Sequence, residues 1–257
     1  MARARNRISF EPLESRLLLN GQTLTWLGQT AGGWSDPSNW SGGASGAYPG
    51  SDNQADTLVF SAANYSGFYN TANNNLSNLS LAGIEFIGDN NGSTNAFTLT
   101  GNAVTLTGPN GLQLSNAASG SGGNTYIATV GLAGVKLGAT DTWLNSCGTL
   151  DVTAPVNLNG NTLTLNGALA SGATGPTQTT FGGGITGLTD SGSTPALENT
   201  GGGVLTISAG SQGLAGSTTL LADTGSTISD APIAYSRIAG KRPDRQPRWP
   251  DCQVRCG

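Results

Sequence analysis

Residues 99–108 read Leu-Thr-Gly-Asn-Ala-Val-Thr-Leu-Thr-Gly, and residues 158–167 read Leu-Asn-Gly-Asn-Thr-Leu-Thr-Leu-Asn-Gly. The two decapeptides align without a gap, and residues 204–210, Val-Leu-Thr-Ile-Ser-Ala-Gly, form a weaker copy. Apolar residues alternate with Thr, Asn or Ser, which is the pattern of a strand with one buried face. The neighbouring glycines supply the backbone freedom that tight turns need. Short strands, glycine turns and spaced internal copies predict a parallel β-solenoid.

The same pattern continues through most of the chain, and no helical period is sustained. Strand-like segments recur at intervals of about ten residues. They cover residues 84–87, 97–100, 104–107, 112–114, 126–130, 135–137, 150–152, 156–158, 163–165, 204–207 and 219–221. Roughly 180 residues at about 20 per coil predict on the order of nine coils. A β-sandwich also uses short alternating strands, so this alternative stays open.

The composition excludes several classes of function. The 257 residues include 40 Gly, 11 Lys and Arg, 15 Asp and Glu, and no His. Without His the chain can form no Ser-His-Asp triad, no Cys-His couple and no histidine metal site. Few basic residues predict no nucleic-acid binding, because phosphate neutralisation drives that binding. No apolar run approaches the roughly 20 residues of a membrane-spanning helix, so we predict no membrane-spanning segment.

Charge is distributed unevenly along the chain. Residues 17–236 contain one basic residue, Lys136, and eleven acidic residues. The other ten basic residues lie in residues 1–16 and 237–257. The abrupt change after residue 236 predicts a truncated or frame-shifted C-terminus. The alternative is a genuine basic tail that binds an anionic surface.

Tryptophan is concentrated near the N-terminus. Trp26, Trp34 and Trp40 are three of the five tryptophans of the chain. A solenoid exposes an apolar cross-section at its end unless a cap covers it, so we predict that residues 21–60 form an N-terminal cap. The alternative is a glycan-contact site, in which the three indole rings stack on sugar rings.

Carboxylates are the only plentiful acid–base groups. Three pairs of them could serve as the acid and the base or nucleophile of a glycosidase. They are Asp52 with Asp56, Glu85 with Asp89, and Asp141 with Asp151. Nothing in the sequence singles out one pair, so we interpret them as solvated carboxylates in turns. A polysaccharide lyase would need a strong base together with cations that stabilise the enolate, and Lys136 is the only cation of the acidic region.

The remaining site motifs are incomplete. Residues 89–93, Asp-Asn-Asn-Gly-Ser, lack the sixth-position Gly and the closing Glu of a calcium loop. The glycine runs at residues 182–184 and 201–203 lack the Lys-Ser/Thr of a P-loop, and we interpret them as turns. Cys147 is interpreted as a small buried side chain, and Cys252 and Cys256 have no further ligand nearby. We therefore predict no catalytic, cofactor-binding or metal-binding residues.

The N-terminal segment carries a recognisable motif. Residues 10–19 read Phe-Glu-Pro-Leu-Glu-Ser-Arg-Leu-Leu-Leu, and no ordinary signal-peptide core of 7–15 apolar residues is present. The decapeptide resembles the F-E-x-L-E-x-R-x-L-L motif at the N-termini of secreted planctomycete-type bacterial proteins. The resemblance implies an envelope or extracellular protein, and the motif itself carries no known chemistry.

A second resemblance covers most of residues 23–230. Residues 202–208, Gly-Gly-Val-Leu-Thr-Ile-Ser, precede Gly-Ser-Thr-Thr-Leu at residues 216–220. This order resembles the autotransporter-associated β-strand repeat, although the full L-T-K-x-G-x-G-x-L-T-L signature is absent. Residues 26–60 and 141–152 resemble the entry to such repeats. The resemblance implies a right-handed parallel β-helix in a secreted or surface-displayed passenger region, where most such regions are structural or adhesive.

These observations predict an all-β protein with four segments. They are an export-associated motif at residues 1–20, a Trp-rich cap at residues 21–60, a β-helix repeat region at residues 61–236 and an anomalous basic tail at residues 237–257. We expect a non-enzymatic, exported structural or adhesive protein, located outside the cell or on its surface. The alternatives are a carbohydrate-binding surface protein and, less favoured, a polysaccharide-degrading enzyme. The expected partners are surface polysaccharides or other envelope proteins, and the sequence leaves the oligomeric state open.

Overall fold

A computed structural model of the chain describes residues 21–31, 33–62, 70–88, 96–116, 126–167, 177–188, 196–207, 219–222, 227–230 and 237–240. Side chains are described within these ranges for residues 21–115 and 126–207, and the backbone alone beyond them. The predicted export motif at residues 1–20, the incomplete calcium-loop motif at residues 89–93 and the tail from residue 241 onward lie outside the described residues.

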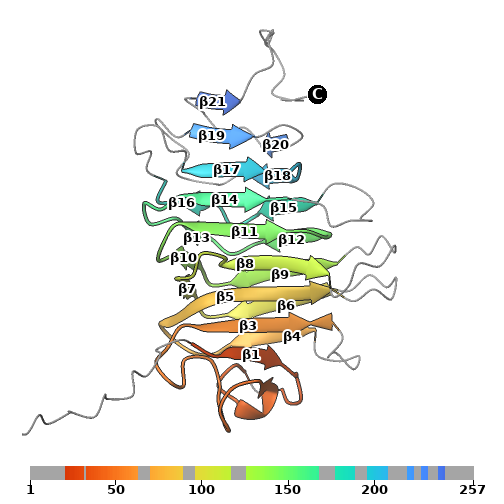
Figure 1. Cartoon of the computed structure of the whole chain (residues 1–257), viewed down its shortest axis with the longest axis vertical. Coiled ribbons are helices and arrows are strands. Elements are labelled where there is room, and N and C mark those ends of the chain that lie inside the picture. Colours follow the sequence, from red (N-terminus) through yellow and green to blue (C-terminus); the bar gives the residue numbers. More distant parts are fainter. Residues whose placement is uncertain are drawn as a thin grey trace, which may run out of the picture.

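Most of the described regular structure is β-strand, and the single helical turn within it is η1 (Pro37–Asn39). One sheet contains seven strands in the order β20-β18-β15-β12-β9-β6-β4. From β4 to β20 their bounds are Thr71–Asn74, Ala96–Gly101, Ile127–Leu132, Thr149–Val152, Gln178–Phe181, Val204–Ile207 and Thr227–Asp230. All neighbours in this sheet are parallel, and the strands follow one another along the long axis of the molecule (Figure 1).

The second sheet contains 14 strands and divides into two arms at β5 (Leu79–Gly88). The start of β5 pairs with β7, whereas its second half pairs with β8. The short arm comprises β7 (Val104–Leu106), β10 (Val135–Leu137), β13 (Val156–Asn157) and β16 (Ile185–Thr186). The long arm comprises β8 (Leu112–Asn116), β11 (Asp141–Asn145), β14 (Leu163–Asn166), β17 (Leu197–Thr200), β19 (Thr219–Ala222) and β21 (Arg237–Gly240).

The chain visits the three groups of strands in turn. It passes from the seven-stranded sheet to the short arm and then to the long arm, as in β6, β7 and β8 and again in β9, β10 and β11. Paired residues of the seven-stranded sheet from β6 onward lie between 22 and 31 positions apart, as Thr149 with Ile127 and Ile127 with Ala96 show. Each circuit is therefore longer than the predicted 20 or so residues, because long connections separate some of the strands.

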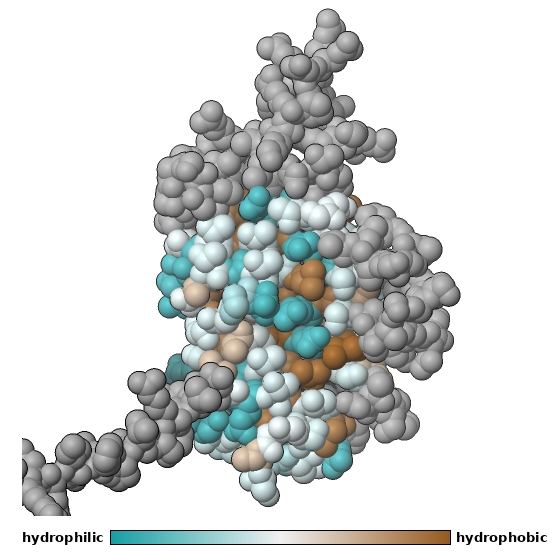
Figure 2. All heavy atoms as spheres, viewed as in Figure 1, coloured by the Kyte–Doolittle hydropathy of each residue, from teal (hydrophilic) through white to brown (hydrophobic). Residues whose placement is uncertain are grey.

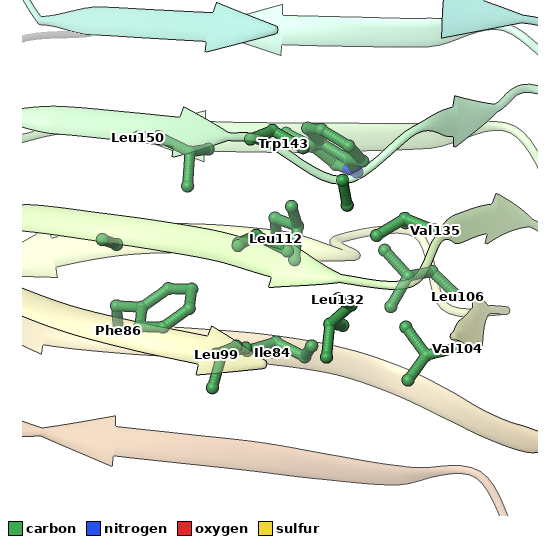
Figure 3. Close-up of a cluster of buried hydrophobic side chains, with 14 of the residues drawn as sticks. Ile84, Phe86, Leu99, Val104, Leu106, Leu112, Leu132, Val135, Trp143 and Leu150 are labelled. Carbon is green, nitrogen blue, oxygen red and sulfur yellow. The ribbon is translucent and has the colours of Figure 1, made fainter. Parts of the chain in front are cut away.

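Side chains alternate between the interior and the surface, which confirms the period-two pattern of the sequence. Leu99, Val130, Val152 and Phe181 are register partners on adjacent strands, and each is 0% exposed. A second buried row lines the short arm and consists of Val104, Val135, Val156 and Ile185. Figure 3 shows side chains of both rows in the interior between the strands. Burial of each such side chain contributes about 1.5–3 kcal/mol, so the rows hold neighbouring strands together along the axis.

The two decapeptides of the sequence occupy different places in the fold. Residues 104–106 form β7 in the short arm, whereas residues 163–166 form β14 in the long arm, so the copies are not register partners. In both decapeptides a sharp turn at a glycine precedes the strand. Gly101 has a φ of 97° before β7, and Gly160 has a φ of 79° before β14. Both corners need a residue that accepts positive φ, followed by an alternating strand, and this common need explains the similarity.

The N-terminal block continues the second sheet at one end. β1 (Thr23–Trp26) is parallel to β3 (Asp56–Ser61) and antiparallel to β2 (Trp40–Ser41), and β3 is parallel to β5. Every other described pairing is parallel. The β-sandwich alternative, which rests on antiparallel neighbours, therefore does not describe this fold. The alternating pattern could not decide this, because it reports burial and not strand direction.

No helix among the described residues is long and apolar enough to cross a membrane.

Candidate binding site

An open groove with a volume of about 520 Å³ runs across the short arm. Its floor consists of the start of β5, the strands β7, β10 and β13, and Thr186 of β16. The corner segments before these strands supply the other lining residues, which are Ser77, Asn78, Asn102, Ala103, Gly134 and Pro155. A groove of this volume falls within the range of ligand sites in proteins.

Each strand of the short arm is so short that it turns only one side chain outward. These side chains form one row of register partners across the groove, which consists of Thr105, Lys136, Asn157 and Thr186. Adjacent strands of a sheet lie about 4.8 Å apart, so the groups of the row follow one another at about this distance. Hydroxyl and amide groups both donate and accept hydrogen bonds, whereas the ammonium group only donates. The row therefore suits a ligand rich in hydroxyl groups that also carries a negative charge.

Lys136 is the only Lys or Arg whose side chain the structure describes. It is exposed, and no hydrogen bond or ion pair joins its ammonium group to the described residues. No Asp or Glu lines the groove. The nearest faces differ in this respect, because Glu85 and Glu198 lie on the second half of β5 and on β17, and Asp151 lies on β12. The groove is thus the one described face that combines a cation with no carboxylate.

Hydrogen bonds fix the backbone around the groove. The amide nitrogen of Asn102 donates to the carbonyl oxygen of Asn74 at 2.7 Å, and its Nδ2 donates to the carbonyl oxygen of Leu76 at 3.1 Å. The Oδ1 atom of Asn157 accepts from the amide nitrogen of Asn159 at 2.8 Å. Asn157 of the row thus helps to hold the backbone, as does Thr186, whose hydroxyl group donates to the carbonyl oxygen of Val156 at 3.4 Å. The Thr105 and Lys136 side chains form no hydrogen bond with the described residues.

The three tryptophans of the N-terminal block are inside the molecule. Trp26, Trp34 and Trp40 are 1%, 0% and 6% exposed. Their rings pack at centroid distances of 5.1 Å for Trp26 with Trp40 and 6.1 Å for Trp34 with Trp40, and all three contact Phe60. A sugar stacks on an exposed ring face, and these rings offer none. The arrangement does not support the alternative of a glycan contact, and it fits the role of a buried plug at the end of the sheet.

The interpretation of the carboxylates as solvated turn residues is wrong for two of them, which are buried at the starts of β3 and β11. Asp56 is 0% and Asp141 is 1% exposed. Asp56 accepts hydrogen bonds from the amide nitrogens of Gln22 and Gly50, both at 2.7 Å. Burial raises the pKa of Asp56 and of Asp141 above the ordinary value, and the hydrogen bonds they accept oppose this shift. Both groups therefore tie backbone segments together within the fold.

The structure places the three candidate carboxylate pairs in different surroundings. Asp52 is exposed and accepts from the Nε2 atom of Gln22 at 2.9 Å, close to the buried Asp56. Asp141 and Asp151 belong to different sheets. Glu85 is described, but its candidate partner Asp89 lies outside the described residues. No group of three or more Cys, Asp or Glu that could hold a metal occurs among the described residues.

Cys147 lies in the interior, and the glycine runs lie in turns between strands. Cys147 is free and buried, as predicted, and burial raises the pKa of its thiol to about 11. Gly184 lies at the corner between β15 and β16, and Gly201 and Gly202 lie between β17 and β18. All three have positive φ, which confirms their interpretation as turn residues. Cys252 and Cys256 lie outside the described residues.

Sequence reasoning singled out Lys136 for its isolation but did not place it in a site. The outward positions of short strands could be read from the alternation, but their alignment across coils could not, because the connections differ in length. Comparison of the chain with protein-family models, with curated proteins and with solved structures finds no match.

Proposed function

We propose that the chain is a non-enzymatic, exported β-helix protein that acts outside the cell as a rigid structural or adhesive element. The observation that carries the proposal is the order of the strands. Three groups of parallel strands are visited in turn, and successive circuits pair in register along one axis (Figure 1). A parallel β-helix is the simplest path that gives this order, and crossovers between parallel strands are right-handed in nearly all proteins.

Rigidity follows from this arrangement. Each coil forms backbone hydrogen bonds with the coils before and after it, and the buried rows run on from coil to coil. Stability is then a sum of contacts between nearest neighbours, and the cluster around Phe60 covers the first coil as a cap does. The outward faces carry many Thr, Asn and Ser side chains, and Figure 2 shows one face with mixed polar and apolar character. Repeated polar rows suit many weak contacts that add along the length.

The extracellular location rests on the two resemblances of the sequence. The decapeptide at residues 10–19 resembles an export-associated motif, and the repeat region resembles passenger repeats. A non-enzymatic role is supported by the use of the buried carboxylates, since Asp56 and Asp141 each accept hydrogen bonds that join separate segments. A carbohydrate-binding role is the second candidate, and the groove across the short arm favours it.

Fractionation of cells that express the full chain tests the location. We expect the protein in the envelope or in the medium, detected with an antibody against the full chain. Recovery in the cytosol alone would contradict export. Purified protein incubated with a panel of polysaccharides should release no reducing ends, and turnover that disappears in a single carboxylate variant would overturn the non-enzymatic proposal.

A further inference from the structure

We propose that the groove across the short arm binds an acidic polysaccharide in which uronate sugars alternate with uncharged sugars. Lys136 pairs with one uronate carboxylate, and the neighbouring Thr105 and Asn157 contact sugar hydroxyl groups. The proposal deepens the proposed extracellular role and rests on it for access to such a polymer. It assigns a class of ligand to an open groove on the surface of the molecule.

The positive charge of Lys136 favours a negatively charged ligand in the groove. Lys136 is the only Lys or Arg whose side chain is described, it has no carboxylate partner among the described residues, and no Asp or Glu lines the groove. Lys136 is also the one basic residue among residues 17–236, which contain eleven acidic residues. A lysine is a point charge with three donors, which suits a carboxylate that approaches along the groove.

The single cation also limits the charge density of the ligand. A polymer with a negative group on every sugar would place further charges over Thr105 and Asn157, which cannot neutralise them. Uncharged sugars next to one uronate instead meet hydroxyl and amide groups that donate and accept. One uronate with an uncharged sugar on each side therefore matches the order Thr105, Lys136 and Asn157 along the row.

The length of the groove suits a chain rather than a monosaccharide. Its lining extends over five consecutive strands of the sheet, from β5 through β7, β10 and β13 to Thr186 of β16. Four steps between adjacent strands give a floor about 19 Å long. An extended oligosaccharide can contact several strands at once, and its weak contacts then add along the groove.

Binding of hyaluronan oligosaccharides tests this assignment, because in them a uronate alternates with an uncharged amino sugar. Titration calorimetry of the full chain at low salt should show saturable binding. Lys136→Gln should weaken it by about twofold to fivefold, since an exposed ion pair is lost. Added salt should weaken binding by the wild-type protein, because salt screens the exposed pair.

The matched control is Gln178→Glu. It changes the net charge by the same amount as Lys136→Gln, but Gln178 lies exposed on β15, outside the groove, with Thr149 and Val204 as its uncharged register partners. We expect unchanged affinity for this variant. Asn157→Asp provides a second variant inside the groove, and it should also lower affinity, because its carboxylate neutralises Lys136. Circular dichroism melts of all variants check that they fold.

Several results would overturn the proposal. They are no binding of hyaluronan by the wild-type protein, equal affinity of Lys136→Gln, and an equal loss for Gln178→Glu. Neutral dextran that competes equally would remove the role of charge. Tighter binding of polygalacturonate or dextran sulfate would replace the proposed ligand by a densely charged polymer. Each of these results concerns the groove alone, whereas failure of export in the fractionation experiment concerns the proposed function.

Discussion

The indole Nε1 atom of Trp143 donates a hydrogen bond of 3.0 Å to Oδ2 of Asp141, two residues earlier in the same strand. The second carboxylate oxygen, Oδ1, accepts from the amide nitrogen of Gly111 at 2.7 Å. Asp141 and Trp143 are both 1% exposed. One buried carboxylate therefore joins β11 to the segment before β8, on the preceding circuit of the chain.

Replacement of Asp141 by Ala should destabilise the protein by about 2–4 kcal/mol, because two buried donors lose their acceptor. The free energy of unfolding in urea measures the effect. Asp151→Ala is the matched control, since Asp151 is partly exposed and accepts no hydrogen bond from the described residues. It should change stability by no more than about 0.5 kcal/mol. Equal losses in the two variants would contradict the role of the Asp141 hydrogen bonds.

Stability should increase when the pH falls from 7 toward 4. Burial raises the pKa of Asp56 and Asp141 above 3.8, so the folded state binds protons more tightly than the unfolded state. Their stabilising contribution is complete below the unfolded pKa and is lost as the pH rises through the folded pKa. Asp36 acts in the opposite direction, because a hydrogen bond from Thr30 and others from Ser38 lower its pKa, but it is accessible to solvent.

Melting temperatures at several pH values check this dependence. The melting temperature of the wild-type protein should be higher at pH 4.5 than at pH 7. The buried carboxyl groups of Asp56 and Asp141 are expected to contribute to this difference. Asp141→Asn should show a smaller difference between the two pH values, because one of the three carboxyl groups whose pKa is raised, Asp56, Asp141 and Asp151, is absent. A melting temperature that falls steadily on acidification would contradict the expected sign.

Trp26 and Trp40 of the N-terminal block should differ in how much stability the protein loses when each is replaced by Phe. The Nε1 atom of Trp40 donates to the carbonyl oxygen of Trp34 at 2.8 Å, whereas the buried Nε1 atom of Trp26 has no hydrogen-bond partner. Both replacements remove the same volume, but only Trp40→Phe takes a donor from a buried acceptor. We expect Trp40→Phe to cost about 1 kcal/mol more than Trp26→Phe in urea unfolding. A larger loss of stability in Trp26→Phe than in Trp40→Phe would show that this hydrogen bond does not stabilise the fold.

Two glycines with similar backbone angles should respond very differently to Ala. Gly101 has a φ of 97° and Gly46 a φ of 76°. A Cβ atom at Gly101 would clash with the carbonyl oxygen of Asn74 on the neighbouring strand, whereas at Gly46 no atom lies within 4 Å. Gly46→Ala should cost only the backbone strain of about 1–2 kcal/mol. Gly101→Ala should cost more, and equal melting temperatures for the two variants would contradict the close approach at this corner.

The sequence predicted the strands well, because a buried face requires alternation that is visible residue by residue. Leu99 and Val104 were expected to be buried from this alternation, and they are. The alignment of Val104 with Val135 was not predictable, because it depends on connections of unequal length.

The candidate site was harder to anticipate for the same reason. Thr105, Lys136 and Asn157 are far apart in the sequence and become neighbours only through the register of three short strands. Conversely, the clustering of Trp26 and Trp40 was visible, but whether the rings face solvent or the interior depends on how β1 and β2 pair.

Cross-linking of cysteines placed on successive circuits tests the stacking of the coils. Thr98 and Thr129 are outward register partners on β6 and β9, and adjacent strands lie about 4.8 Å apart, within the range for a disulfide. Asp151 is the partner of Thr129 on β12, one strand further on. In a full chain with its native cysteines replaced by Ala, Thr98→Cys with Thr129→Cys should form a disulfide that mass spectrometry locates. Thr98→Cys with Asp151→Cys should form none, and efficient cross-linking of this second pair, or none of the first, would contradict the in-register stacking of coils.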